Sequence, residues 1–144
     1  MTPLYLLDTN ILILAVRGGA VWSRVQAKYQ LLTAEPTPLI SVVTAGELRS
    51  LAYQWGWATA KRDQMEFLLG YFKVVDILDP AVIEAYAVID SRLQQRGYSH
   101  DKNDLWIAAT VSVTGATLLT TDRDFDPLHP EFVTREWIDQ SPPT

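Results

Sequence analysis

Four acidic residues stand beside apolar segments whose pattern predicts a parallel α/β sheet. Asp8 and Asp122 end apolar runs typical of strands, and Glu47 and Asp104 lie near the starts of expected helices. Carboxylates gathered in one pocket repel each other unless a cation lies among them. Mg²⁺ and Mn²⁺ prefer oxygen ligands of this kind. The four acids therefore predict a metal centre suited to cleaving a phosphodiester bond.

Apolar runs and helical periodicity alternate along the chain. Strands are predicted at residues 4–7, 39–40, 73–78, 117–120 and 132–133. Helices are predicted at residues 10–16, 21–33, 41–55 and 59–72, from 80 to about 97, and from 101 or 103 to 113. Residues 141–144 are expected to fray. The alternation predicts an α/β three-layer sandwich, with a parallel sheet of about five strands between helices.

Each acid taken alone has an ordinary structural explanation. Asp8 could cap a helix, Glu47 could be a solvated helix residue, and Asp122 could belong to a turn. Asp104 could simply stabilise the positive N-terminal end of its helix. Taken together, all four fall at the same end of the predicted sheet. Ligands bind beyond the carboxyl ends of the strands in such sheets, so the joint placement favours a functional site.

The composition is that of one globular domain over residues 1–144. Apolar residues make up 48% of the chain, which is enough for a sizeable core, and there is no cysteine. A disulfide framework, a zinc–thiolate site and a thiol nucleophile are therefore excluded. The first apolar stretch is short and broken by Asp8 and Asn10, so we expect neither a signal peptide nor a membrane span. A cytoplasmic protein is expected.

The charge balance is acidic. The formal net charge is −5 and the isoelectric point is about 4.9. Nucleic-acid binding normally needs a basic surface, and the twelve Lys and Arg residues form no basic stripe in the sequence. The proposed metal site supplies several of the negative charges, and a bound divalent ion would offset them. Phosphate chemistry through a metal is thus compatible with the composition.

Short motifs around the four acids resemble those of PIN-domain ribonucleases, and most closely the VapC toxins of type II toxin–antitoxin pairs. Asp8-Thr9-Asn10 opens the chain as in that family, and residues 41–48 match its Ser-x-x-Thr-x-x-Glu-Leu segment. Asn103-Asp104 precedes an Ile-Ala-Ala run, and Thr121-Asp122 precedes Asp-Phe two residues later. The resemblance covers the chain from Leu4 to about Val133.

The resemblance implies an activity, a cofactor and partners. It implies a Mg²⁺- or Mn²⁺-dependent endoribonuclease that acts as a toxin on structured RNA such as tRNA or rRNA. It also implies a small antitoxin partner, which would lay a helix or an extended segment into an apolar groove, and a homodimer with helices at the contact.

The resemblance also implies roles for individual residues. The metal would be held, directly or through water, by Asp8, Glu47, Asp104 and Asp122. Thr9 and Asn10 would support the site by hydrogen bonds. Thr121 would position the fourth acid or a water molecule.

Other polar residues near the motifs have simpler explanations as surface groups. The two histidines, His100 and His129, have neighbours typical of loops. Asp101 and Asp124 could lie just outside the metal ligands, but surface turns explain them equally well. Three cations flank the acids and could touch a phosphate, although solvated charge is the simpler interpretation: Arg49, Lys102 and Arg123.

The five tryptophans divide into two groups. Trp55 and Trp106 fall at helical spacing with aliphatic residues, which predicts that they pack in the core. Trp22, Trp57 and Trp137 have no clear pattern and could belong to the core, to a partner surface or to a platform for stacking bases.

Other functions fit the sequence less well. A haloacid-type phosphatase needs Asp-x-Asp near the chain start, where this chain has Asn10, and a receiver domain needs a late lysine where this chain has Arg123. No Walker loop, GxGxxG or GxSxG motif occurs. A non-catalytic binding module on the PIN scaffold is the main alternative. The presence of all four acids argues against it.

Overall fold

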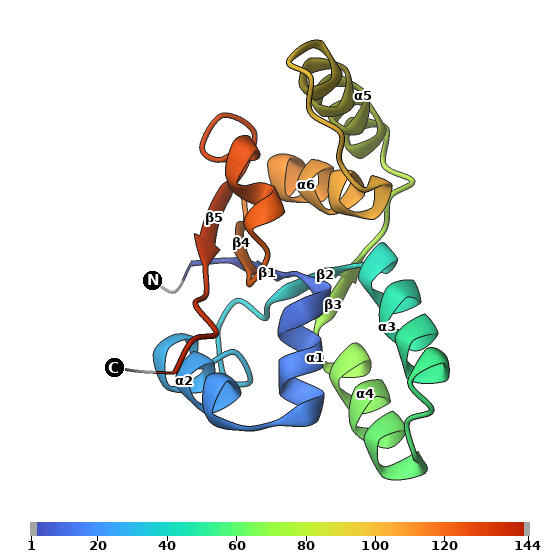
Figure 1. Ribbon diagram of the computed structural model, residues 1–144, viewed down its shortest axis with the longest axis vertical. Helices are drawn as coiled ribbons and strands as arrows, with labels where there is room; N and C mark the ends of the chain where they lie inside the picture. Colours follow the sequence, from blue (N-terminus) through green and yellow to red (C-terminus); the bar gives the residue numbers. More distant parts are fainter. Residues whose placement is uncertain (1–2, 143–144) are drawn as a thin grey trace.

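Five parallel strands form the sheet at the centre of the protein. The computed structural model describes residues 3–142, and its strands are ordered β3-β2-β1-β4-β5 (Figure 1). Their bounds are Tyr5–Leu7 for β1, Leu39–Ser41 for β2, Lys73–Val75 for β3, Thr117–Thr120 for β4 and Thr134–Trp137 for β5. Every neighbouring pair is parallel. The predicted fold class is confirmed.

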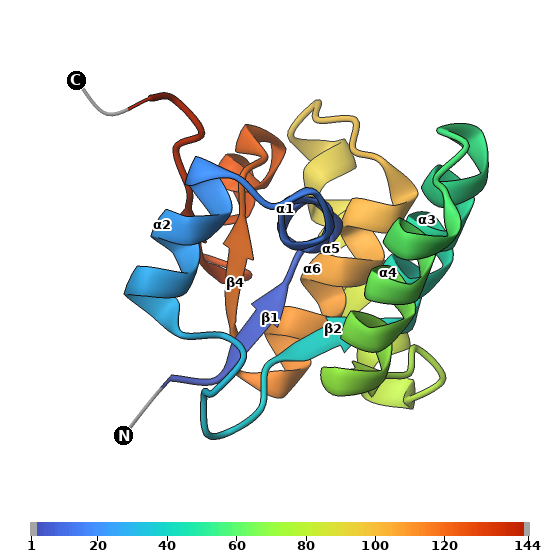
Figure 2. The same cartoon turned by 90° about the horizontal axis from the view of Figure 1, so that it is seen from below.

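Helices cover both faces of this sheet, as Figure 1 shows. Four of them contribute to the apolar core on one face: α1 (Thr9–Arg17), α2 (Ala20–Tyr29), α3 (Val42–Gln54) and α4 (Thr59–Tyr71). Figure 2 shows α1 end-on over β1, between α2 and α4. The opposite core is covered by α5 (Pro80–Gln95), α6 (Lys102–Thr114) and the short 3₁₀ helix η1 (Arg123–Leu128).

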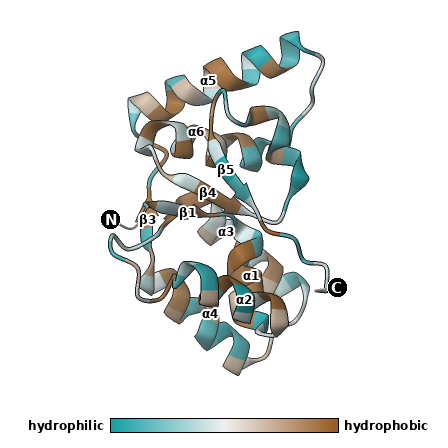
Figure 3. Ribbon diagram, turned by 90° about the vertical axis from the view of Figure 1, so that its left-hand side faces the viewer, coloured by the Kyte–Doolittle hydropathy of each residue, from teal (hydrophilic) through white to brown (hydrophobic). Residues whose placement is uncertain are grey.

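The alternation of side chains along a strand divides the two cores. In β1, Leu7 packs into the core with α1 and α4, whereas Leu6 packs into the core with α5 and α6. Both leucines are fully buried. Figure 3 shows hydrophobic segments, in brown, in helices on either side of the sheet. Strands covered on both faces are apolar throughout, which is why they read as unbroken apolar runs in the sequence.

Helix caps explain most of the predicted boundaries. The Ser41 hydroxyl accepts a hydrogen bond from Val43 N and caps α3, and Asp79 caps α5 with Pro80 at its first position. For α6 the cap is Asp101, whose carboxylate accepts from Asn103 N at 2.8 Å. Of the two predicted starts, 101 and 103, the first is the observed one.

Three boundary predictions were wrong. Helix α2 ends at Tyr29 and not at 33, because Gln30 adopts a left-handed conformation with φ of 51°. Strand β3 ends at Val75 and not at 78, because Asp76 starts a turn by accepting from Leu78 N. The fifth strand lies at Thr134–Trp137 and not at 132–133, because that pair closes the turn after η1 by donating to Leu128 O.

The tryptophan prediction was also partly wrong. Trp55 follows the last residue of α3 and is 45% exposed, so it lies outside the core. Trp57 is buried instead, at 7% exposure, and its backbone N–H donates a hydrogen bond to Ala52 O. Trp106 is half-buried and stacks on Tyr86 with ring centroids 4.0 Å apart.

The strand ends bring distant segments to one edge of the sheet. Asp8 follows β1, Ser41 ends β2 and Asp122 comes two residues after β4, and these three strands are neighbours in the sheet. Their carboxyl ends therefore meet at the same edge. Within residues 3–142, no helix combines the length and the apolar character that crossing a bilayer requires. The predicted fraying at 141–144 lies partly outside the described residues.

Candidate active site

Asp8 is the most buried acid at the carboxyl edge of the sheet. Asp8 is the N-cap of α1, and the residue is only 4% exposed. Its Oδ1 accepts from Thr9 N and its Oδ2 accepts from the Thr120 hydroxyl, both at 2.8 Å. Burial raises the pKa of Asp8 to about 6, the negative charges of Glu47 and Asp122 add to the rise, and the two hydrogen bonds oppose it.

The Thr9 hydroxyl joins the first predicted acid segment to the second. Thr9 Oγ1 donates to Glu47 Oε1 at 2.8 Å and lies 3.1 Å from the hydroxyl of the fully buried Thr44. Glu47 and Thr44 both belong to α3, three residues apart, so they present to the same side of that helix. The contact fixes the Glu47 carboxylate relative to the start of α1. Thr9 is thus hydrogen-bonded to one of the four predicted acids.

Three further carboxylates lie close together at the same edge. Asp104, Asp122 and Asp124 each have an oxygen within 4.8 Å of the other two. Asp122 is the N-cap of η1, and its Oδ1 accepts from Asp124 N at 2.8 Å. The pKa of Asp104 is raised to about 8, first by burial and then by the charges of Asp8 and Asp122. Within residues 3–142, none of these three carboxylates forms an ion pair with a Lys, Arg or His side chain within 4.0 Å. The site therefore concentrates negative charge.

The four predicted acids do not all lie in one tight group. Asp8 and Glu47 both contribute to the raised pKa of Asp104, so the four interact electrostatically. However, the 4.8 Å group found within residues 3–142 contains Asp124 and neither Asp8 nor Glu47. The exposed Asp124 had no strong signal in the sequence, because its position depends on the 3₁₀ turn that follows Asp122.

Thr120 is the site residue that the sequence did not reveal. Its hydroxyl donates to Asp8 and accepts from Asp122 N at 2.9 Å, and the residue is fully buried. The predicted Thr121 instead offers its backbone carbonyl to the Trp137 indole at 3.0 Å. Asn10 lies half-buried in the first turn of α1, and its side chain makes no hydrogen bond within residues 3–142. An unbroken Thr-Thr-Asp run gives no indication of which hydroxyl faces the acids.

The other candidate residues are held in place around the site or away from it. His100 lies 3.0 Å from the backbone oxygen of Asp124, and Asp101 adds to the charges that raise the pKa of Asp104. Each of the three flanking cations pairs with an acid. The pairs are Arg49 with Glu66 at 3.0 Å, Lys102 with Asp90 at 3.7 Å and Arg123 with Asp126 at 3.3 Å.

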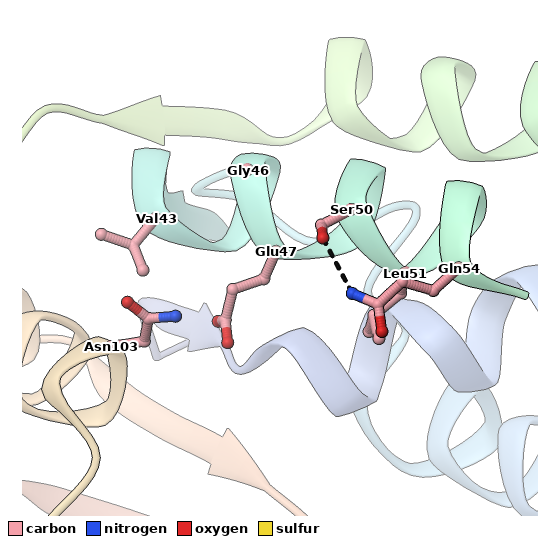
Figure 4. A pocket seen from close by; sticks show the side chains of 7 residues that line it. All are labelled: Val43, Gly46, Glu47, Ser50, Leu51, Gln54 and Asn103. Carbon is pink, nitrogen blue, oxygen red and sulfur yellow. Dashed lines mark hydrogen bonds between the residues drawn. The ribbon is translucent and has the colours of Figure 1, made fainter.

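A cavity of about 490 Å³ opens beside the acids, along α3. Figure 4 shows Glu47 and Asn103 near one end and Gln54 near the other, with Ser50 between them. Gln54 Nε2 donates to Ser50 Oγ at 2.9 Å. On the side formed by α3, these polar side chains are interspersed with the apolar Val43 and Leu51. The cavity leads from the carboxylates toward the C-terminal end of that helix.

The family model for the PIN domain matches residues 5–128. The chain belongs to the PIN-domain family. This PIN-domain chain is also 40% identical over 88 residues to Ribonuclease VapC4 from Mycobacterium tuberculosis, an alignment that covers 60% of this chain and 67% of VapC4. The resemblance to VapC proteins is therefore confirmed.

Solved structures support the same fold. The crystal structure of VapBC2 from Rickettsia felis bound to a promoter DNA fragment contains a chain with a TM-score of 0.76 and 21% identity, covering 94% of this chain and 99% of that one. A chain in the crystal structure of DNA-bound VapBC from Salmonella typhimurium gives a TM-score of 0.72 and 20% identity, covering 95% and 99%. At these identities the likeness concerns the PIN-domain fold alone.

The acids of this PIN domain fit a hard divalent cation. All the candidate donors are carboxylate oxygens, and no cysteine is available in the chain to favour a softer metal. Burial, and then like charges, raise the pKa of both Asp8 and Asp104, so the charged forms of these acids are unfavourable without a compensating ion. The donor chemistry therefore matches Mg²⁺ or Mn²⁺.

Proposed function

We propose that this chain is an endoribonuclease, dependent on Mg²⁺ or Mn²⁺, that hydrolyses phosphodiester bonds in structured RNA as the toxin of a toxin–antitoxin pair. The observation that carries the proposal is the group formed by Asp104, Asp122 and Asp124, with Asp8 and Glu47 beside it. Membership of the PIN-domain family and the similarity to Ribonuclease VapC4 support it. The substrate class is tRNA or rRNA.

Each carboxylate has a place in this proposal. Asp8, Glu47, Asp104 and Asp122 hold the metal directly or through water, and Asp124 joins them beside Asp104 and Asp122. When bound, a divalent ion would lower the pKa of a water molecule at the site and neutralise charge on the phosphoryl oxygens. Hydrolysis by water leaves a 5′-phosphate and a 3′-hydroxyl on the RNA fragments.

Two hydroxyl groups keep these carboxylates in position. Thr9 orients Glu47, and Thr120 orients Asp8 while fixing the backbone at Asp122. Both threonines are buried, so their hydrogen bonds do not compete with bulk water. The acids are thereby set in place before substrate arrives, which reduces the reorganisation that catalysis would otherwise require.

The proposed partners follow from the same family. The structural neighbours include VapBC complexes, which supports a small antitoxin encoded with this chain. Such a partner would lay a helix or an extended segment into an apolar groove near the site. A homodimer with helices at the contact completes the assembly, and the cytoplasm is where its RNA substrates would be met.

The direct test is cleavage of purified tRNA and rRNA by the purified chain. We expect cleavage at few positions in the presence of Mg²⁺ or Mn²⁺, loss of cleavage in excess EDTA, and recovery when the ion is restored. The matched control is Asp63→Asn, which removes an exposed acid from α4 and should cleave like the wild type. A chain that binds the ion but cleaves no RNA would be a binding module on the PIN scaffold.

A further inference from the structure

Aromatic and cationic side chains gather at the C-terminal end of α3, next to the cavity that begins at the acids. The Arg17 guanidinium lies 4.7 Å from the centre of the Trp55 ring, and Arg62 lies at the same distance from the Tyr53 ring. Lys61 lies 5.9 Å from the Trp57 ring. We call Arg17, Tyr53, Trp55, Trp57, Lys61 and Arg62 the Trp55 cluster.

The cluster presents flat aromatic surface to solvent. Tyr53 is 73% exposed and Trp55 is 45% exposed, whereas Trp57 is buried. The Trp55 and Trp57 rings are 5.7 Å apart and tilted by 51°, so Trp57 packs against Trp55 without stacking flat on it. Exposed rings with a rigid support are what stacking of unpaired bases requires.

The cluster also carries positive charge that the acids of this protein do not neutralise. Half of the twelve Lys and Arg residues form ion pairs within 4.0 Å in the part of the chain that the structure describes. Arg17, Lys61 and Arg62 are not among them. An arginine that lies over an aromatic ring keeps N–H groups at its edge for a phosphate. In a chain of net charge −5, this end of α3 is therefore suited to an anionic ligand.

A row of three polar side chains on α3 leads from the carboxylates toward the cluster. Glu47, Ser50 and Gln54 recur at helical spacing on one side of α3 and line the cavity, as Figure 4 shows. Trp55 follows Gln54 directly, and Arg17 reaches it from the last turn of α1. The Ser50 hydroxyl and the Gln54 amide on this wall can hydrogen-bond to the edges of unpaired bases.

From these contacts we infer that the Trp55 cluster binds a single-stranded segment of the RNA substrate, with a base stacked on Trp55 and a phosphate held by Arg17. This inference rests on the proposed function, because it names the part of the substrate that the same site would hold. Eight positions of an α-helix separate Glu47 from Trp55, which is about 12 Å. Stacked bases rise about 3.4 Å each, so roughly three nucleotides separate the cleaved phosphate from the stacked base.

The test measures RNA affinity in a background that cannot complete cleavage. Trp55→Ala, Trp55→Phe and Arg17→Gln are each combined with Asp104→Asn, and fluorescence anisotropy follows a labelled single-stranded RNA decamer of random sequence. Loss of one stacked base weakens binding by about 5- to 140-fold. We expect a loss of this size in Trp55→Ala and near-parent affinity in Trp55→Phe. In Arg17→Gln, the dependence of RNA affinity on salt concentration should fall by about one phosphate contact.

Two matched controls distinguish the cluster from general surface effects. Phe67→Ala removes an aromatic side chain that is 59% exposed on α4, and Arg92→Gln removes a cation that is 54% exposed on α5. Both variants should bind the decamer with the affinity of the parent. A duplex RNA of the same length should bind equally well to the parent and to Trp55→Ala, because its bases are already paired and stacked. Circular dichroism confirms folding, and if Trp55→Ala does not fold, Arg17→Gln and a Tyr53→Ala variant decide the question.

The outcomes separate this inference from the proposed function. Parent-like RNA affinity in folded Trp55→Ala and Arg17→Gln would overturn the inference and leave the cluster to a protein partner. Equal losses in the Phe67 and Arg92 controls would overturn it as well. A wild-type chain that cleaves no RNA with either ion, but binds the decamer through Trp55, would refute catalysis and support the RNA-binding cluster.

Discussion

The Thr120 hydroxyl donates to Asp8 Oδ2 at 2.8 Å and accepts from Asp122 N at 2.9 Å. One buried side chain thus fixes two acids that are 114 residues apart in the sequence. The contact depends on the pairing of β1 with β4, in which Leu7 lies opposite Leu119. The end of the sheet and the proposed metal site are therefore one structural unit.

Thr120→Val should damage both stability and activity. Valine has nearly the same shape but leaves the buried Asp8 Oδ2 without its donor, and such a loss costs about 1–3 kcal/mol. We expect urea denaturation to show a fall of this size in the free energy of unfolding, with RNA cleavage reduced at saturating metal. Thr121→Val removes the neighbouring hydroxyl and serves as the control. Similar losses in the two variants would show that Thr120 has no special role.

Asp104→Asn should abolish cleavage while stabilising the metal-free protein at high pH. The folded protein raises the pKa of Asp104 to about 8, so between about pH 4 and 8 the folded state holds more protons than the unfolded state. Stability contributed by this group is therefore present at low pH and is lost as the pH rises through 8. The variant lacks this loss. Its advantage over the wild type should grow from pH 5 to pH 8 in urea titrations with EDTA.

The same titrations give a matched control for charge. Asp63→Asn removes an exposed acid from α4 that does not belong to the acidic group, and its effect on unfolding should be within about 0.5 kcal/mol at both pH values. A stability difference between wild type and Asp104→Asn that does not change with pH would contradict the crowding of charge described here.

Metal affinity should increase steeply with pH. Binding requires charged carboxylates, and the pKa of Asp8 is raised to about 6 and that of Asp104 to about 8. Isothermal titration with Mn²⁺ should therefore show affinity rising between pH 6 and pH 8, by up to about tenfold per pH unit for each proton released. Asp122→Asn and Asp124→Asn should each weaken binding. An affinity independent of pH, or unaffected by both substitutions, would refute the proposed ligand set.

The sequence was informative about groups attached to strand ends and helix starts. Asp8 and Asp122 follow apolar runs, so their place at one edge of the sheet followed from the parallel architecture. Ser41 and Asp79 carry local capping signals and were placed correctly for the same reason. Such features depend on a few neighbouring residues, which a single sequence contains.

Contacts between distant segments were not predictable in this way. The roles of Thr120 and Thr44 depend on strand pairing and on the packing of α1 against α3, which local patterns do not encode. Asp124 enters the acidic group through a 3₁₀ turn with Pro127 inside it. Trp55 was wrongly placed in the core because helical periodicity continued past the end of α3, where the chain turns and buries Trp57 instead.

The most direct test of the central claim is to map the ends of RNA fragments after incubation of tRNA and rRNA with the purified chain and Mn²⁺. The wild type should give new fragments with 5′-phosphate and 3′-hydroxyl ends at a small number of positions, and Asp104→Asn should give none while remaining folded. Cleavage that continues at the wild-type rate in Asp104→Asn, or in excess EDTA, would contradict a metal-dependent site built on these carboxylates.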